Sequence, residues 1–296
     1  MTDTFLHDGV PTLRASGFTG ATAVPLYWEV YGPADSSRVL VLHGGPGADH
    51  EYLLPQMLEL ARDRELAFYD QRGGGRSKTD DRAPITWQTH VADLGAVIRE
   101  FALDPVTIIG YSWGGLLALL YASEAASDPT LPAPTRLALI DPAPVSRQFR
   151  EVFEAEFARR QSAPPVQAMR EALAASDLRV RDPEGYRHRV FELSVAGYFA
   201  DPRAAYDLTP FRVVGRVQQS VWESLGDYDL VHDGRLAAIR CPALIVHGAQ
   251  DPIPLASSEA CAHALGAELV TLEGCGHVPY VEQPAALFRA LRRFLA

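Results

Sequence analysis

A serine stands at the centre of Gly110-Tyr-Ser-Trp-Gly114, which fits the pattern Gly-x-Ser-x-Gly. A serine hydroxyl is a weak nucleophile unless it is exposed beside a base, and a sharp strand-to-helix turn flanked by glycines presents it in that way. The serine follows the apolar run Val106-Thr-Ile-Ile-Gly110 and precedes the apolar run Leu116-Leu-Ala-Leu-Leu120. These runs predict the strand and the helix, so we interpret Ser112 as a nucleophile.

A base and an acid for this serine are expected further along the chain, the acid first. Asp251 follows the predicted strand Pro242–His247, and His277 follows the predicted strand 268–272. A histidine can take the serine proton and return it to the leaving group, and a carboxylate can orient the imidazole. Asp251 could also be an ordinary Asp-Pro turn residue, and His277 a loop residue. Asp141, at another strand end, is the rival acid, with anchoring of a helix or cap as its alternative role.

Acyl transfer also needs two backbone N–H groups that point at the developing oxyanion. One comes from the residue after the nucleophile, which is Trp113, and the other from the loop after an earlier strand. The loop His43-Gly-Gly-Pro-Gly47 follows the run Arg38-Val-Leu-Val-Leu42, and we predict Gly44 as its donor. The histidine of this loop is interpreted as fixing the loop and not as a second catalytic base.

The elements that must position these residues are alternating apolar strands and amphipathic helices, which indicate an α/β fold with a mostly parallel sheet and helices on both faces. Such sheets place ligands beyond the carboxyl ends of their strands, where all the residues above stand. The predicted strands are 26–31, 38–43, 65–70, 106–110, 136–141, 242–247 and 268–272. Helices are predicted at about 50–63, 86–101 and 113–125, between the last two strands, and from about 280.

The pattern changes between residues 144 and 237. This stretch has helical spacing, many charges and proline-containing breaks, but no convincing buried strand. We therefore predict an α/β-hydrolase core formed by residues 1–143 and 238–296, with a helical cap at 144–237 inserted after one core strand.

Composition excludes several classes of protein. The net charge is −10 without a basic cluster, which argues against nucleic acid as a partner. The apolar runs fall short of the roughly 20 residues that span a membrane, and residues 1–8 lack the features of a signal peptide. The sequence thus predicts a cytoplasmic protein that does not bind membranes. The three cysteines, one of them two residues before His277, are interpreted as inert thiols.

The motifs together resemble the proline iminopeptidase (prolyl aminopeptidase) family of α/β-hydrolases. The resemblance rests on 43–47, 110–115 and Gly274-Cys-Gly-His277, and on Asp70-Gln-Arg-Gly-Gly-Gly-Arg-Ser77. It covers roughly residues 20–143 and 238–296. It implies that the segment 70–77 shapes the floor of the site without reacting, and that its arginines form structural salt bridges.

The resemblance implies a substrate class as well. Similar enzymes use no metal or organic cofactor, and they remove an amino-terminal residue, preferentially proline, from short peptides through an acyl-enzyme. They bind the free amine with a cap carboxylate, because a buried ammonium must be paired. In many relatives a segment like Glu-Asn-His-Tyr-Phe supplies one such carboxylate, whereas Val195 replaces that glutamate in Val195-Ala-Gly-Tyr-Phe199. Glu192 and Glu223 are the candidates to substitute for it.

Two other functions compete with this one. An esterase or lactonase would use the same catalytic residues on a small-molecule substrate, and the aromatic residues of the predicted cap suit it equally well. A non-catalytic ligand-binding protein on the same fold is the third hypothesis, and the complete serine, aspartate and histidine set argues against it.

Overall fold

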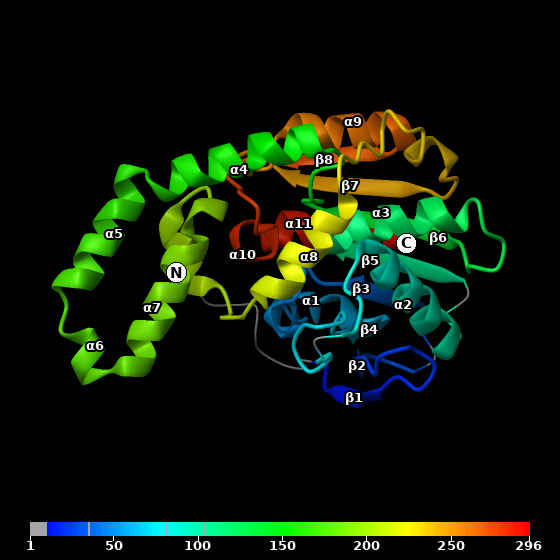
Figure 1. The fold of residues 1–296 in the computed structure, drawn as a ribbon, viewed down its shortest axis with the longest axis horizontal. Helices are drawn as coiled ribbons and strands as arrows, with labels where there is room; N and C mark the ends of the chain where they lie inside the picture. The colour runs from blue at the N-terminus through cyan, green and yellow to red at the C-terminus, as the bar shows by residue number, and fades with distance from the viewer. Residues whose placement is uncertain (1–10, 35, 81, 104) are drawn as a thin grey trace.

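A computed structural model describes residues 11–34, 36–80, 82–103 and 105–296. Across these residues the strands form a single central sheet in the order β1-β2-β4-β3-β5-β6-β7-β8 (Figure 1). The β1–β2 and β2–β4 pairs are antiparallel, and the remaining pairs are parallel. The strands are β1 (Leu13–Phe18), β2 (Tyr27–Tyr31), β3 (Arg38–Leu42), β4 (Glu65–Tyr69), β5 (Val106–Tyr111), β6 (Pro134–Ile140), β7 (Ala243–Gly248) and β8 (Glu268–Leu272). The predicted α/β fold is confirmed.

The central strands are buried because both faces of the sheet carry helices, which explains their continuous apolar sequences. One face packs against α2 (Trp87–Glu100), α3 (Trp113–Ala125) and α9 (Leu255–Leu265). The other packs against α1 (Leu54–Met57) and α11 (Pro284–Leu295), with α10 (Pro279–Glu282) nearby. Alternate residues of the central strands enter the two opposite cores, as Leu40 and Val41 of β3 do.

Two elements differ from the sequence prediction. The helix expected at about 50–63 is broken into η1 (Glu51–Leu53), α1 and η2 (Leu60–Arg62). Pro55 contributes to the break, because proline cannot donate the backbone hydrogen bond that would continue the preceding turn. Strand β1 was not predicted, because it is an edge strand with mostly exposed residues and lacks the apolar pattern of the others.

Helices occupy the chain between β6 and β7, in the stretch predicted as a cap. They are α4 (Arg147–Gln161), α5 (Pro164–Ala175), α6 (Leu178–Arg181), α7 (Pro183–Val195) and α8 (Gly215–Leu225), with η3 (Ala196–Tyr198), η4 (Pro202–Asp207) and η5 (Leu236–Ala238). Helices α5, α6 and α7 extend away from the sheet, whereas α8 crosses in front of it (Figure 1). In the described part of the chain, no helix is long and apolar enough to span a membrane. The division into core and cap domains stays a prediction.

A buried ion network joins β2 to the loops at the edge of the site. The His50 ring is fully buried, with Nδ1 2.6 Å from Asp70 Oδ1 and Nε2 3.1 Å from Glu29 Oε2. Burial lowers the pKa of His50, but the hydrogen bonds that its ring donates to these two carboxylates outweigh burial and raise the pKa to about 9. The charged imidazole thus holds together segments that are about twenty residues apart in sequence.

This network predicts that the protein loses stability at alkaline pH. The pKa of His50 is about 9 in the folded state against 6.5 in the unfolded state, so its contribution is complete below pH 6.5 and is lost as the pH rises through 9. At 1.36 kcal/mol per pKa unit, the free energy of unfolding should fall by about 3 kcal/mol over that interval. Urea unfolding at several pH values measures it, and His50→Gln should flatten the dependence. An equally steep dependence in the variant would contradict the assignment.

Candidate active site

The serine of the Gly-x-Ser-x-Gly motif lies at a sharp turn between β5 and α3. Ser112 has φ 52° and ψ −119°, a conformation that a non-glycine residue rarely adopts and that requires support from its surroundings. A Cβ on Gly110 would lie 2.5 Å from the Gly114 carbonyl oxygen, and one on Gly114 would lie 2.3 Å from the Leu42 carbonyl oxygen. The two glycines are therefore needed because the backbone passes so closely through the turn.

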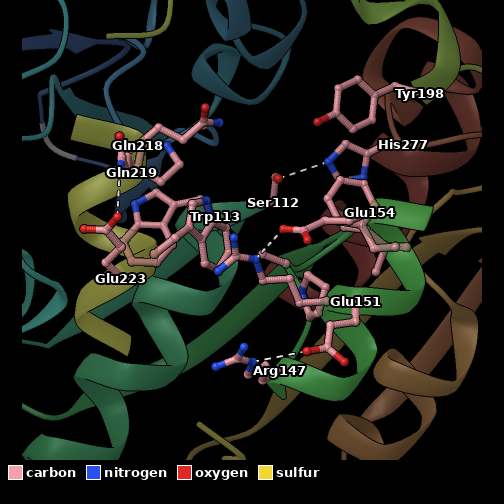
Figure 2. A pocket seen from close by; sticks show the side chains of 18 of the residues that line it. Ser112, Trp113, Arg147, Glu151, Glu154, Tyr198, Gln218, Gln219, Glu223 and His277 are labelled. Carbon is pink, nitrogen blue, oxygen red and sulfur yellow. Dashed lines mark hydrogen bonds and ion pairs between the residues drawn. The ribbon is translucent and has the colours of Figure 1, made fainter. Parts of the chain in front are cut away.

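The structure brings Ser112, His277 and Asp251 together from three different sheet-edge loops. The Ser112 hydroxyl donates to His277 Nε2 at 3.0 Å, and His277 Nδ1–H donates to Asp251 Oδ2 at 2.7 Å. Figure 2 shows the serine side chain directed at the imidazole. This arrangement of nucleophile, base and orienting acid has the geometry of a catalytic triad.

The histidine is held from both sides. Its backbone N–H donates to the Tyr198 carbonyl oxygen at 2.7 Å, and the Tyr198 ring stacks on the imidazole with centroids 5.0 Å apart. Glu282 links the segment that follows Tyr198 to the loop that carries His277, because its carboxylate accepts hydrogen bonds from the N–H groups of Ala200 and Gly276 at 2.8 Å each. Burial lowers the pKa of His277 to about 4, which keeps the imidazole neutral and able to accept a proton.

A cavity of about 690 Å³ opens over Ser112 and His277. Its walls come from the loop after β3, from the start of α3, from α4 and from α8. Figure 2 shows labelled side chains from the last three of these. The wall formed by α4 and α8 carries both charged and aromatic side chains. The guanidinium carbon of Arg150, for example, lies 4.4 Å from the centre of the Trp222 ring. The volume suits a small molecule or a few residues of peptide.

The structure does not place the Gly44 N–H where the sequence analysis expected it. This N–H donates to the Tyr52 hydroxyl at 2.7 Å and is therefore not free to bind an oxyanion. The next residue, Gly45, lines the cavity together with Ser112 and Trp113. Trp113 is the first residue of α3, where N–H groups have no partner within the helix. Gly45, one residue further along the same loop, therefore replaces Gly44 as the candidate N–H donor to the oxyanion.

The loop carrying this donor is fixed by a buried polar network. His43 Nδ1–H donates to the Gly44 carbonyl oxygen, and His43 Nε2 accepts the Gln71 N–H at 3.1 Å. The Gln71 side chain in turn accepts the Trp113 indole N–H at 2.7 Å. Arg72 makes a buried bidentate ion pair with Asp93. His43 and the segment 70–77 thus support the site without lining the cavity.

The two cap glutamates predicted to bind substrate lie in different places. Glu192 of α7 is buried and accepts from Arg189 at 2.8 Å, beside a separate cavity of about 210 Å³. Glu223 of α8 lines the cavity over Ser112 and accepts from the Gln219 side-chain amide at 2.7 Å. The expectation that Glu192 binds substrate is therefore corrected, because its carboxylate pairs with Arg189 beside another cavity. Glu223 remains a candidate, because it lines the cavity over Ser112.

Helix α4 contributes charged residues that the sequence analysis missed. Glu151 and Glu154 line the cavity, each in an ion pair with an arginine four residues earlier: Arg147 at 3.2 Å and Arg150 at 2.7 Å (Figure 2). The spacing Arg-x-x-x-Glu was visible in the sequence, but it is also typical of any solvated helix. Only the placement of α4 over the serine distinguishes these residues.

One group of side chains has the composition of a metal site. Within the described residues, one ligating atom each from Asp141, His247 and Asp251 lies within 4.8 Å of the others. Asp251, however, already accepts hydrogen bonds from His277 and from the Ile253 N–H. Its remaining capacity to bind an ion is small.

Comparison with known proteins gives the class. Residues 39–290 match the family described as the alpha/beta hydrolase family. Since the match covers most of the chain, this protein belongs to that family and is a hydrolase.

Within the family, the chain is similar to proline iminopeptidases, which confirms the resemblance predicted from the motifs. The proline iminopeptidase of Levilactobacillus brevis is 29% identical over 299 residues, covering 93% of this chain and 94% of the relative. Among solved structures, the Mycobacterium smegmatis proline iminopeptidase aligns with a TM-score of 0.68 at 20% identity, covering 95% and 97% of the two chains. The enol-lactonase from Burkholderia xenovorans aligns with a TM-score of 0.66 at 20% identity, covering 94% and 99%. At these identities the structural likeness defines the fold alone.

Proposed function

We propose that this protein is a serine hydrolase that removes an amino-terminal residue, preferentially proline, from short peptides. Ser112 Oγ attacks the scissile carbonyl carbon while His277 Nε2 takes the hydroxyl proton. His277 then gives that proton to the leaving amine as the C–N bond breaks, which leaves an acyl-enzyme on Ser112. Water attacks the ester with its proton passing to His277, and the return of that proton to Ser112 releases the product.

The N–H groups of Gly45 and Trp113 are the proposed donors to the tetrahedral oxyanion. Removing one such donor typically costs a factor of 10² to 10³ in kcat. Asp251 holds the proton of His277 on Nδ1, so that Nε2 faces the serine as an acceptor. The proposal needs no metal and no organic cofactor for any of these steps.

Recognition of the amine rests on Glu223, and this is the observation that carries the proposal. The carboxylates of Glu151 and Glu154 are each paired with an arginine on their own helix. Among the described residues, Glu223 has only the neutral Gln219 amide as a hydrogen-bond partner. It is thus the cavity carboxylate with capacity to bind an ammonium group, in a position unrelated to Val195.

The variant Glu223→Gln tests this role. Loss of a hydrogen bond to a charged group should raise KM for proline arylamides by about tenfold to a hundredfold. Hydrolysis of a short-chain aryl ester, which has no amine, should be unchanged because the triad is intact. Steady-state kinetics on both substrates measures the difference.

Glu192→Gln is the matched control, since it makes the same chemical change on a cap helix beside a different cavity. We expect it to leave KM for proline arylamides unchanged. A larger effect at Glu192 than at Glu223 would mean that the amine binds on the other side of the cap.

Hydrolysis of esters or lactones is the second candidate. It is favoured by the replacement of the family glutamate with Val195, which is buried, and by the aromatic residues Tyr198 and Trp222 in the cavity wall. Under this candidate both glutamine variants would be neutral, and plain esters would be preferred over amino-terminal amides.

A further inference from the structure

The carboxyl group of Asp141 lies directly behind the proposed triad. It follows β6, is completely buried, and has φ 40°, a left-handed conformation that aspartate tolerates better than most residues. Its backbone N–H donates to the Val246 carbonyl oxygen at 2.8 Å, and its Oδ1 accepts the Gly248 N–H at 2.8 Å. Asp141 is therefore fixed against β7, the strand that leads to Asp251.

The second oxygen of this carboxyl group is an exception among buried polar atoms. In the described part of the chain, Asp141 Oδ2 is buried and accepts no hydrogen bond. A buried carboxylate with one of its oxygens unpaired is strongly disfavoured, whereas a protonated carboxyl group can turn the same atom into a donor. The geometry therefore favours a proton on Oδ2.

Two groups lie close enough to accept that proton. His247 Nδ1 is 3.6 Å from Asp141 Oδ1, but this ring donates from Nε2 to the Ile253 carbonyl oxygen and accepts the Ser258 hydroxyl at Nδ1. Its acceptor is thus already used, and its burial keeps it uncharged with a pKa of about 4. The side chain of Asp251 is the remaining partner, since one of its carboxyl oxygens lies within 4.8 Å of a carboxyl oxygen of Asp141. Burial raises the pKa of both carboxyl groups, and a hydrogen bond between them raises the pKa of Asp141 further and lowers that of Asp251.

Of the two carboxyl groups, Asp251 is the better one to ionise. It accepts from His277 Nδ1–H and from the Ile253 N–H at 2.7 Å each, whereas Asp141 accepts a single N–H. Two adjacent buried carboxylates cannot both be charged without a cation between them. Burial and the charge of Asp251 accordingly raise the pKa of Asp141 well above its usual range.

We propose that Asp141 is a positioning residue that carries a proton on Oδ2 and donates it in a hydrogen bond to the Asp251 carboxylate. The inference rests on the proposed triad but not on the proposed substrate. This hydrogen bond orients the acid from behind and stabilises its charged form, which in turn stabilises the imidazolium of His277 during acyl transfer. Burial raises the pKa of Asp251, and the hydrogen bond from Asp141 lowers it.

Titratable groups from several elements face Asp141. His247 and Asp251 belong to β7 and the loop after it. The others are Tyr111 of β5, Cys275 and His277 of the loop after β8, and Tyr280 of α10. Burial raises the pKa of both tyrosines and of the cysteine, so they are neutral. Asp251 and His277 are in turn faced by Glu282 of α10 and Asp251 by Arg160 of α4. Because the Asp141 variants leave Glu282 and Arg160 in place, a shift of the acidic limb between wild type and variant reports the pair Asp251 and His277.

Leucine and asparagine variants of Asp141 separate hydrogen bonding from packing, because the two side chains are similar in size. The readout is the rate at which a fluorophosphonate labels Ser112 across a pH series, which needs no assumption about substrate. Asp141→Leu removes the donor, so the labelling rate should fall by about tenfold or more and the acidic limb should move to higher pH. Asp141→Asn keeps both a donor and an acceptor, so it should restore most of the rate and the wild-type limb.

A shift of the acidic limb in the opposite direction would overturn the proposal. If Asp141 were ionised, both variants would remove a negative charge from beside Asp251 and move the acidic limb to lower pH. If Asp141 were merely structural, Asp141→Leu would lower the melting temperature and leave the labelling profile in place. Either result contradicts a protonated donor.

Infrared spectroscopy tests the proton itself, even if Asp141→Leu does not fold. The wild-type protein should show the C=O stretch of a protonated carboxyl group at neutral pH, and Asp141→Asn should lose it. Absence of the band in the wild type, or its persistence in the variant, would overturn the inference. Failure of wild-type Ser112 to label would instead reject the triad, so the two failures are distinguishable.

Discussion

Replacement of Ser112 by alanine should abolish hydrolysis and leave the fold intact. Loss of the nucleophile in a comparable triad costs on the order of 10⁶ in kcat, since only oxyanion and binding contributions remain. The Ser112 hydroxyl makes its side-chain hydrogen bond to His277, so its removal breaks no contact of the hydrophobic core. Activity on an aryl ester measures the first expectation, and thermal unfolding measures the second.

Covalent labelling gives the same prediction an independent readout. A fluorophosphonate should add one group to the wild-type chain at Ser112 and none to Ser112→Ala. Ser258 is the matched control, because it is a buried serine that hydrogen-bonds to a different histidine, His247. Labelling at Ser258, or full activity in Ser112→Ala, would contradict the assignment of the nucleophile.

Replacement of Asp251 by asparagine should lower kcat on the order of 10⁴, the effect of the same change in a well-studied triad. The structure explains why the loss should be large here. Asp251 Oδ1 accepts the Ile253 N–H at 2.7 Å, so the amide oxygen of the variant would stay there and its NH₂ would face His277 Nδ1. The imidazole would then carry its proton on Nε2, where it cannot accept the serine proton.

Asp141→Asn provides the comparison for this prediction, because it is the same substitution in the neighbouring carboxyl group. Its loss of kcat should be far smaller, since an amide retains the hydrogen bonds of a protonated carboxyl group. If Asp141→Asn proved the more damaging change, the triad acid would have been assigned to the wrong strand. Steady-state kcat of both variants on one substrate decides between them.

The sequence sufficed for the fold because its core strands are buried on both faces and are therefore continuously apolar, as 38–42 and 106–110 are. It did not suffice for β1, whose residues at the edge of the sheet are mostly exposed and carry no such signal. It also failed for the helix at about 50–63, since periodicity cannot show how Pro55 interrupts the backbone hydrogen bonds.

The site shows the same division between local and tertiary information. The order and strand-end placement of Ser112, Asp251 and His277 are local features, and the structure brings the three together. The choice between Gly44 and Gly45 depends on the Tyr52 hydroxyl, which reaches the loop only through tertiary packing.

The cap was the least predictable part of the site. Glu192 and Glu223 are alike in sequence, since both are glutamates in stretches with helical spacing. Their difference arises from the arrangement of α7 and α8, which places Glu192 beside a separate cavity and Glu223 at the wall of the cavity over the serine. Helix spacing alone contains no information about that arrangement.

Blocking the substrate amine tests the proposed activity most directly. The wild-type protein should hydrolyse proline arylamides with a free amine, and acylation of that amine should nearly eliminate turnover. The Glu223 carboxylate would then face an uncharged amide, so the interaction that binds the free ammonium group would be lost. Equal or faster hydrolysis of the acylated arylamide, or a preference for plain aryl esters, would contradict the aminopeptidase assignment and identify an esterase-like enzyme.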